Sequence, residues 1–173
     1  MSYAKVPLGE KSPQIVNAVI EIVGGSNKKY EYKEEWDEIR LDRILYSNVF
    51  YPGEYGFLPH TRAEDGDHLD VLVIISGPTF PGCVLAVRPI GALDMADQNG
   101  KDWKIIAVAA GDPRLEEYSS LDDLDEHRKK EIWHFFETYK QLENKEVKVN
   151  GWLGKEDAYR IIGEAKERFE KES

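Results

Sequence analysis

The sequence predicts a mainly β protein with α-helices: a small β-barrel with helices packed on it, in one domain spanning residues 1–173. Before Gly111, short apolar segments alternate with Gly, Pro and Asn, which is typical of many short strands. After Gly111, apolar residues recur at helical spacing. A domain of this length buries roughly 68–70% of its unfolded surface, so it needs no metal or disulfide for stability.

The first strands are predicted from β-branched residues and turn signals. Val16–Val23 is rich in valine and isoleucine and ends at a Gly-Gly-Ser-Asn turn. Tyr30–Lys33 and Ile39–Leu45 flank a charged turn and are expected to form the second and third strands.

Arg43 in the third strand has the same parity as Ile39 and Leu41, so we expect its side chain to point inward with them. An inward guanidinium needs an anionic partner, which leaves two alternatives: a carboxylate in a buried ion pair, or a bound phosphate group.

The middle of the chain contains the predicted barrel core. Tyr51–Phe57 places two glycines between aromatic residues, which indicates either a bent backbone that presents tyrosine hydroxyls to a site or an aromatic core patch. Asp70–Ser76 is a continuous apolar run, as in a strand buried on both faces. Val84–Met95 and Trp103–Ala109 flank Asn99-Gly100 and are expected to form a hairpin.

The last third of the chain is predicted to be mostly helical. Asp112-Pro113 is typical of a helix start. A helix over Leu124–Leu142 buries one apolar face consisting of Ile132, Phe135, Phe136, Tyr139 and Leu142. Lys145–Val149 could add a strand. A final helix over Glu156–Glu170 has its apolar face at Ala158, Ile161, Ile162, Ala165 and Phe169.

Composition excludes several classes of protein. The formal net charge is −10, which disfavours nucleic acid as a partner. Cys83 is the only cysteine, so an intrachain disulfide and a zinc site made of thiolates are both excluded. The first residues lack an apolar segment after a basic start, and no apolar run is long enough to span a membrane. We therefore expect a cytoplasmic protein without a membrane partner.

The segment Glu64–Asp70 places four acidic residues immediately before the predicted buried strand. Such crowding is costly unless cations neutralise it, and Mg²⁺ prefers carboxylate oxygens of the kind that Asp65, Asp67 and Asp70 supply. An EF-hand loop does not fit, because three of its required positions hold the wrong residues. A phosphatase with a nucleophilic aspartate does not fit either, because it would place its acidic residues after an apolar strand, whereas these residues precede one. A solvated acidic loop remains the simpler alternative.

A second group of acids makes a cation site more plausible than a solvated loop. Asp94, Asp97 and Asp102 flank the predicted hairpin turn, and Glu21 lies within the first apolar strand. In the second strand, Glu31 alternates with two tyrosines.

Taken together, these segments resemble the family I soluble inorganic pyrophosphatases of prokaryotic length. The resemblance rests on the Asp-x-Asp-x-x-Asp-Val pattern at residues 65–71 and extends in register over nearly the whole chain. The other matching positions are Glu21, Lys29-Tyr30-Glu31, Asp42-Arg43, Phe50-Tyr51-Pro52, Tyr55-Gly56, Asp97 to Lys104, His134 to Glu137 and Tyr139-Lys140.

The resemblance implies an activity, a fold and a set of site residues. It implies Mg²⁺-dependent hydrolysis of pyrophosphate, with several ions per site, in a five-stranded OB-like barrel flanked by two C-terminal helices and assembled as a homohexamer. Asp67 is then the general base for direct attack by a metal-activated water. The expected metal ligands are Asp65, Asp70 and Asp102 for the principal ion pair, and Asp97, Glu21 and Glu31 for ions that arrive with substrate. The expected substrate-binding residues are Lys29, Arg43, Tyr55, Lys104, Tyr139 and Lys140.

Two residues depart from the family pattern. Gln98 stands where many short members have Glu, and we expect altered metal affinity with activity retained. His68 stands where the family most often has Pro; it is either a tolerated loop residue or a group that perturbs the titration of Asp67. Two alternative functions remain: an OB-like module that binds oligonucleotides, and an inactive metal-binding relative.

Overall fold

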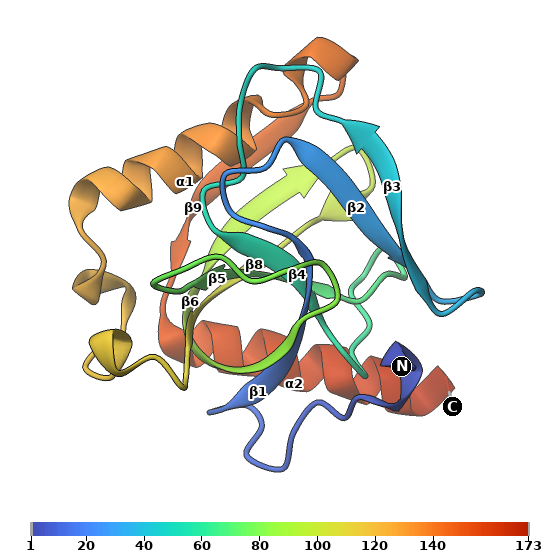
Figure 1. The fold of residues 1–173 in the computed structure, drawn as a ribbon, viewed down its shortest axis with the longest axis vertical. Coiled ribbons are helices and arrows are strands. Elements are labelled where there is room, and N and C mark those ends of the chain that lie inside the picture. The colour runs from blue at the N-terminus through green and yellow to red at the C-terminus, as the bar shows by residue number, and fades with distance from the viewer. Residues whose placement is uncertain (1, 173) are drawn as a thin grey trace.

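The computed structural model describes residues 2–172 as a strand-rich body with two long helices (Figure 1). Its strands are β1 (Val16–Ile22), β2 (Lys28–Lys33), β3 (Glu38–Ile44), β4 (Glu54–Leu58), β5 (Leu69–Ile74), β6 (Val84–Asp97), β7 (Gly100–Lys101), β8 (Lys104–Ala109) and β9 (Val147–Leu153). The helices are α1 (Glu126–Thr138) and α2 (Lys155–Glu172). Short 3₁₀ turns cover Tyr3–Lys5, Pro113–Leu115, Leu121–Asp123 and Gln141–Glu143.

Five of these strands close into a ring in the order β1-β4-β5-β8-β6 and back to β1. Numbered along the chain, the ring order is 1-2-3-5-4, and only the β5–β8 pair within it is parallel. The long strand β6 pairs with β1 through its first half and with β7 and β9 through its second half. The predicted five-stranded OB-like barrel is therefore confirmed.

The ring is packed on both faces. Along β5, Leu72 and Ile74 belong to the apolar cluster that includes α1, whereas Val71 and Val73 belong to the cluster that includes α2. Successive side chains of a strand point to opposite faces, so both faces of β5 are covered. This is why its sequence is a continuous apolar run rather than an alternating one. Figure 1 shows the two C-terminal helices on different sides of the strands.

The segment Tyr51–Phe57 bends at Pro52-Gly53, as predicted, and then continues as strand β4. All five residues of β4 are buried, and the strand pairs with both β1 and β5. Gly56 in this strand allows β1 and β4 to approach closely, because a Cβ at this position would lie 1.9 Å from the carbonyl oxygen of Val19 on β1. An aromatic core patch is correct for Tyr51, which is 2% exposed and whose ring centroid lies 4.7 Å from that of Phe135. Tyr55 also lines a cavity, described below, as the first alternative predicted.

The helix α1 is shorter than predicted. Asp125 caps it by accepting a hydrogen bond from the N–H of Arg128, and Tyr139 forms its C-terminal cap. Leu142 therefore lies in a 3₁₀ turn and is 64% exposed, so its placement on the apolar helix face was wrong. The other predicted apolar residues of α1 are buried, as are four of the five predicted for α2, with Phe169 half-buried.

The predicted helix start at Asp112-Pro113 is only a 3₁₀ turn, although Asp112 does cap it by accepting a hydrogen bond from the N–H of Arg114. The strand predicted at Lys145–Val149 is present, but it lies slightly further along the chain, as β9 (Val147–Leu153).

Strands β2 and β3 form a separate two-stranded sheet outside the ring. Its register is irregular, because Lys29 pairs with Arg43 while the next residue, Tyr30, pairs with Leu41. Asp42 is thus an extra residue that breaks the alternation of β3. The prediction that Arg43 shares a face with Leu41 was wrong: Leu41 is 52% exposed, and the bulge separates it from Arg43, whose side chain is 21% exposed.

Candidate active site

A cavity of about 440 Å³ lies between the β2–β3 hairpin and the ring, and it contains most of the predicted site residues. Twelve of the thirteen line it: Glu21, Lys29, Glu31, Tyr55, Asp65, Asp67, Asp70, Asp97, Asp102, Lys104, Tyr139 and Lys140. They come from β1, β2, β4, β5 and β8, the end of β6, the loops that precede β5 and β8, and the residue pair that follows α1. Segments far apart in the sequence thus meet at one place.

The acidic segment before β5 forms one wall of this cavity. The backbone N–H of Asp67 donates to Oδ1 of Asp65 at 3.0 Å, which turns the loop so that both carboxyl groups face the cavity. Burial raises the pKa of Asp67, and the neighbouring charges of Asp65 and Asp70 raise it further. Burial also raises the pKa of Asp65. These carboxyl groups therefore bind protons more readily than ordinary aspartates do.

Lys104 neutralises two carboxylates at the base of the cavity. Its strand β8 runs parallel to β5, and the two strands place Lys104 and Asp70 in register. The Nζ atom lies 2.5 Å from Oδ2 of Asp70 and 2.6 Å from Oδ1 of Asp102. Lys104 is only 2% exposed, and burial alone would lower its pKa, but Asp102 and Asp70 hold that pKa well above its usual range. Lys104 is therefore a permanently charged ammonium.

The opposite wall comes from β1 and β2. Glu21 is buried, and its Oε1 accepts a hydrogen bond from the N–H of Tyr32 at 2.6 Å. Burial raises the pKa of Glu21 to about 8. For Glu31 burial has the same direction, but Lys29 and Lys33 outweigh it and lower the pKa of Glu31 to about 2. Near neutral pH, Glu21 therefore keeps its proton and is neutral, whereas Glu31 is ionised.

Tyrosine hydroxyls and a lysine complete the lining. Tyr55 and Tyr139 are buried side chains, and burial raises the pKa of both phenols, so each keeps its proton and can donate a hydrogen bond. Nζ of Lys140 lies 3.7 Å from Oδ2 of Asp97. Burial and the charge of Lys104 lower the pKa of Lys140.

Arg43 is the predicted site residue that the cavity lining does not include. Its Nε lies 2.9 Å from Oε1 of Glu143, and a guanidinium N–H donates to Asp42. The sequence left two possible partners for the Arg43 guanidinium, a carboxylate or a phosphate, and in the structure its partner is a carboxylate. The sequence analysis did not identify Glu143, which has no motif and lies 100 positions away from Arg43 in the chain.

The chemistry of the cavity fits hard divalent cations. Nine carboxyl groups line it against five lysine or arginine side chains, so negative charge is in excess. Its acidic donors are oxygens, the ligands that such ions prefer. Within residues 2–172, no three carboxylate, histidine or cysteine side chains are gathered closely enough to form a ready-made metal site. The acids instead surround the cavity, with Lys104 between two of them.

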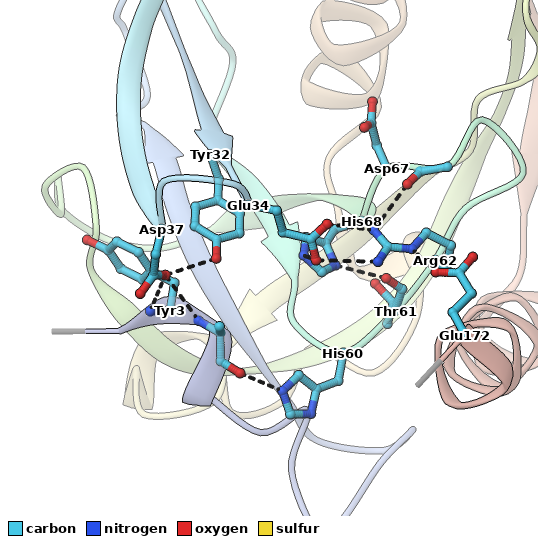
Figure 2. A network of polar contacts seen from close by, with 12 residues as sticks. Tyr3, Tyr32, Glu34, Asp37, His60, Thr61, Arg62, Asp67, His68 and Glu172 are labelled. Atoms are coloured by element: carbon cyan, nitrogen blue, oxygen red, sulfur yellow. Dashed lines mark hydrogen bonds and ion pairs between the residues drawn. The ribbon is translucent and has the colours of Figure 1, made fainter.

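Three residues at one end of the cavity were not among the predicted site residues: Glu34, Arg62 and His68. Nδ1 of His68 lies 2.8 Å from the carbonyl oxygen of Thr61, and Nε2 lies 3.1 Å from Glu34. Figure 2 shows the carboxyl group of Asp67 directed away from the His68 ring. The only sequence signal for this group was that His68 stands where the family most often has Pro. The spacing of Glu34, Arg62 and His68 in the sequence does not indicate that they meet.

Comparison with known proteins identifies relatives of one kind. The family model described as inorganic pyrophosphatase matches residues 18–170. An inorganic pyrophosphatase from Geobacillus stearothermophilus is 50% identical over 156 residues, which cover 90% of this chain and 94% of the relative. The soluble inorganic pyrophosphatase 1 of Arabidopsis thaliana is also 50% identical, but the match covers 73% of that protein.

Solved structures give the same result. The crystal structure of inorganic pyrophosphatase from Thermus thermophilus superposes with a TM-score of 0.94 at 44% identity, covering 98% of this chain and 99% of that one. The inorganic pyrophosphatase from Helicobacter pylori superposes with a TM-score of 0.91 at 39% identity, covering 96% and 99%. The likeness therefore extends over the whole fold and over the segments that surround the cavity.

Proposed function

Because this chain belongs to the inorganic pyrophosphatase family, we propose that its cavity is the active site for hydrolysis of pyrophosphate to two phosphate ions. The chain is an inorganic diphosphatase of the short, bacterial length. The observation that carries the assignment of the site is that twelve of thirteen residues chosen from family motifs line one cavity. Neither an oligonucleotide-binding module nor an inactive relative has comparable support.

The family implies a divalent metal cofactor, and we propose that it is Mg²⁺, with several ions bound per site. Asp65, Asp70 and Asp102 would hold the principal ions, and Asp97, Glu21 and Glu31 would hold further ions beside the substrate. Bound Mg²⁺ neutralises phosphate charge and lowers the pKa of water. The oxygen-rich, net acidic lining supports this choice of ion.

Asp67 is proposed as the general base. Its pKa is raised by burial and by Asp65 and Asp70, which makes its carboxylate a better proton acceptor than an exposed aspartate. In the reaction, a water oxygen bonds to phosphorus, the P–O bond to the bridging oxygen breaks, and the second phosphate leaves with that oxygen. Asp67 accepts the proton that the water gives up. No covalent intermediate with the enzyme is needed.

The cationic and phenolic groups are proposed to bind the phosphates. Lys104 stays charged, and Lys29 and Lys140 line the same cavity, so three ammonium groups can face a polyanion there. Tyr55 and Tyr139 retain their protons and can donate hydrogen bonds to phosphate oxygens. Arg43 remains a proposed phosphate ligand that would have to exchange the carboxylate of Glu143 for substrate.

Three further proposals concern the whole molecule. We propose one domain over residues 1–173, assembly as a homohexamer and a location in the cytoplasm. Among the described residues, neither of the long helices is apolar enough over its length to cross a bilayer. Sedimentation velocity tests the assembly, because a hexamer and a 19.8 kDa monomer separate clearly.

A substrate comparison tests the proposed function. Phosphate release is measured with pyrophosphate, with ATP and with single-stranded DNA as the added phosphate compound, each with Mg²⁺ and with EDTA. We expect rapid release from pyrophosphate that requires Mg²⁺, and slow or no release from the other two. Equal release from all three, or tight binding of the DNA without hydrolysis, would contradict the proposal.

A further inference from the structure

The β2–β3 hairpin needs external support to hold its part of the site. It carries Lys29 and Glu31 on the cavity wall, yet it forms a two-stranded sheet of its own. Isolated two-stranded hairpins are at best marginally stable in water. The position of this wall relative to the acidic segment before β5 therefore depends on contacts that the hairpin makes with the rest of the chain.

Glu34, the first residue after β2, makes such contacts. Its Oε2 accepts a hydrogen bond from Nη1 of Arg62 at 3.2 Å, and its Oε1 accepts one from Nη2 of the same guanidinium at 3.3 Å. Nε2 of His68 lies 3.1 Å from Oε1. One carboxylate on the hairpin thus engages a two-pronged guanidinium from the far wall, and the imidazole of His68 lies beside it (Figure 2). We refer to Glu34, Arg62 and His68 as the Glu34 clamp.

Arg62 is fixed from the other side. Its Nε donates to Oε2 of Glu172 on α2 at 2.8 Å, and its Nη1 also donates to the carbonyl oxygen of Gly66 at 3.1 Å. The guanidinium lies over the ring of Phe169, 5.3 Å from its centroid. The Arg62 side chain is 13% exposed. It is therefore a pre-placed partner, which reduces the entropy lost when Glu34 binds it.

His68 is held equally firmly. A carbonyl oxygen can only accept, so Nδ1 of His68 donates its proton to Thr61. The ring stacks on Phe57 of β4 at 4.9 Å and lies 5.9 Å from the ring of Tyr32 on β2. Burial lowers the pKa of His68, and in the neutral ring Nε2 then has no proton to donate to Glu34. The loop residue between the proposed base Asp67 and β5 therefore contacts the hairpin through its ring packing against Tyr32.

The outer end of the hairpin has separate attachments. Oδ1 of Asp37 accepts hydrogen bonds from the backbone N–H groups of Tyr3 at 2.9 Å and Ala4 at 3.2 Å, and from the hydroxyl of Tyr32 at 2.9 Å. These contacts lie on the other side of the hairpin from Arg62 (Figure 2). Tyr32 also attaches the hairpin to the ring, because its N–H donates to Oε1 of Glu21 and its side-chain ring stacks on Phe57 with centroids 4.9 Å apart. Loss of Glu34 would therefore loosen the end of β2 next to Arg62 without detaching the hairpin from the protein.

We propose that Glu34 is a positioning residue that holds Lys29 and Glu31 at the correct distance from the acidic segment. The inference rests on the proposed function, because it assigns substrate binding to that wall. Glu34 itself touches no reacting atom. Loss of the clamp loosens the grip on pyrophosphate while the base Asp67 and the acids of β5 keep their places. Uniformly weaker binding of this kind raises KM and leaves kcat nearly unchanged.

The matched variants are Glu34→Ala and Glu35→Ala. Both remove one carboxylate from the same rim of the cavity, but no described residue makes a hydrogen bond or ion pair with Glu35. The Glu35 variant therefore measures the effect of lost charge alone. A third variant, Arg62→Lys, keeps the charge of the partner and removes its two-pronged geometry. The double variant Glu34→Ala/Arg62→Lys completes a cycle.

Two readouts are measured on the full chain: steady-state kinetics with pyrophosphate, and amide hydrogen exchange over residues 28–44. Relative to Glu35→Ala, we expect Glu34→Ala to raise KM roughly two- to fivefold, as suits the loss of one exposed ion pair. Exchange in the hairpin should accelerate, while the melting temperature stays within about 2 °C of wild type. In the double variant, KM should not exceed that of the more affected single variant.

The proposal is overturned if Glu34→Ala and Glu35→Ala show the same KM and the same hairpin exchange. It is also overturned if Glu34→Ala lowers kcat with KM unchanged, or if the two single effects add fully. Should the wild-type protein release no phosphate from pyrophosphate, the proposed function fails, and the exchange comparison still decides whether Glu34 holds the hairpin.

Discussion

The ammonium nitrogen of Lys104 lies 2.5 Å from Oδ2 of Asp70, and the two residues are register partners across the parallel strands β5 and β8. The same nitrogen lies 2.6 Å from Asp102. The backbone pairing of the barrel therefore sets this ion pair, and both carboxylates are proposed metal ligands. In the protein without metal, Lys104 supplies the charge that these carboxylates need.

Replacement of Lys104 by methionine should destabilise the metal-free protein. The variant leaves two half-buried carboxylates without their counter-ion. Breaking a fully buried ion pair costs about 3–5 kcal/mol, so we expect a smaller loss here. Mg²⁺ should restore part of this stability, because it can neutralise the same oxygens. Melting temperatures in EDTA and in Mg²⁺ check this for Lys104→Met and wild type. An unchanged melting temperature in EDTA would show that the pair carries no stability.

Replacement of Asp70 by asparagine should weaken metal binding. The side chain keeps its shape but loses its charge, and Asp70 is one of the proposed ligands of the principal ions. We expect the Mg²⁺ concentration for half-maximal activity to rise by roughly tenfold or more, as when a metal ligand shell is disturbed. A titration of activity against Mg²⁺ measures it. A titration curve that coincides with wild type would remove Asp70 from the ligand set.

Glu21 should make the metal-free protein less stable as the pH rises. Its folded pKa of about 8 is above the ordinary value of 4.5, so the folded state holds a proton that the unfolded chain has lost between these values. The contribution of Glu21 to stability is then greatest at low pH and is lost as the pH rises through this window. Glu21→Gln should therefore become progressively more stable than wild type between pH 5 and about pH 8.

Melting temperatures in EDTA over this range check the Glu21 prediction, with the exposed Glu38→Gln as a control. A constant difference between Glu21→Gln and wild type across the range would contradict it.

Gly56→Ala should prevent β1 and β4 from pairing normally. The added Cβ would lie 1.9 Å from the carbonyl oxygen of Val19 and 2.9 Å from Cα of Ile20, both backbone atoms that cannot rotate away. We expect a loss of at least about 3 kcal/mol in the free energy of unfolding. Gly111→Ala, which meets no atom within 4 Å, is the control. Denaturation midpoints that are alike for both variants would disprove the close approach.

Local patterns were sufficient for much of the fold. The β-branched run of β1, the apolar run of β5 and the helical periodicity of α2 each reflect burial along one element, which a sequence displays directly. Strand β4 was missed because the glycines and aromatic residues of Tyr51–Phe57 resemble a loop. Its strand conformation comes from pairing with β1 and β5, which lie elsewhere in the chain.

The candidate site divides in the same way. The acids at Asp65, Asp67 and Asp70 form a local cluster, and family motifs identified the more distant members. The predicted shared face of Arg43 and Leu41 was wrong because a one-residue bulge at Asp42 is not visible in strand parity. Glu34 and Arg62 could not be paired from sequence, because they belong to different segments 28 positions apart and have no shared periodicity.

The central claim is that Asp67 acts as the base for Mg²⁺-dependent hydrolysis of pyrophosphate. The most direct measurement is phosphate release by wild type and Asp67→Asn at saturating Mg²⁺, with EDTA as the metal-free control and circular dichroism to confirm folding. We predict rapid release by wild type, none in EDTA, and turnover reduced by a factor of about 10² or more in the folded variant. Release by Asp67→Asn at the wild-type rate would contradict the account.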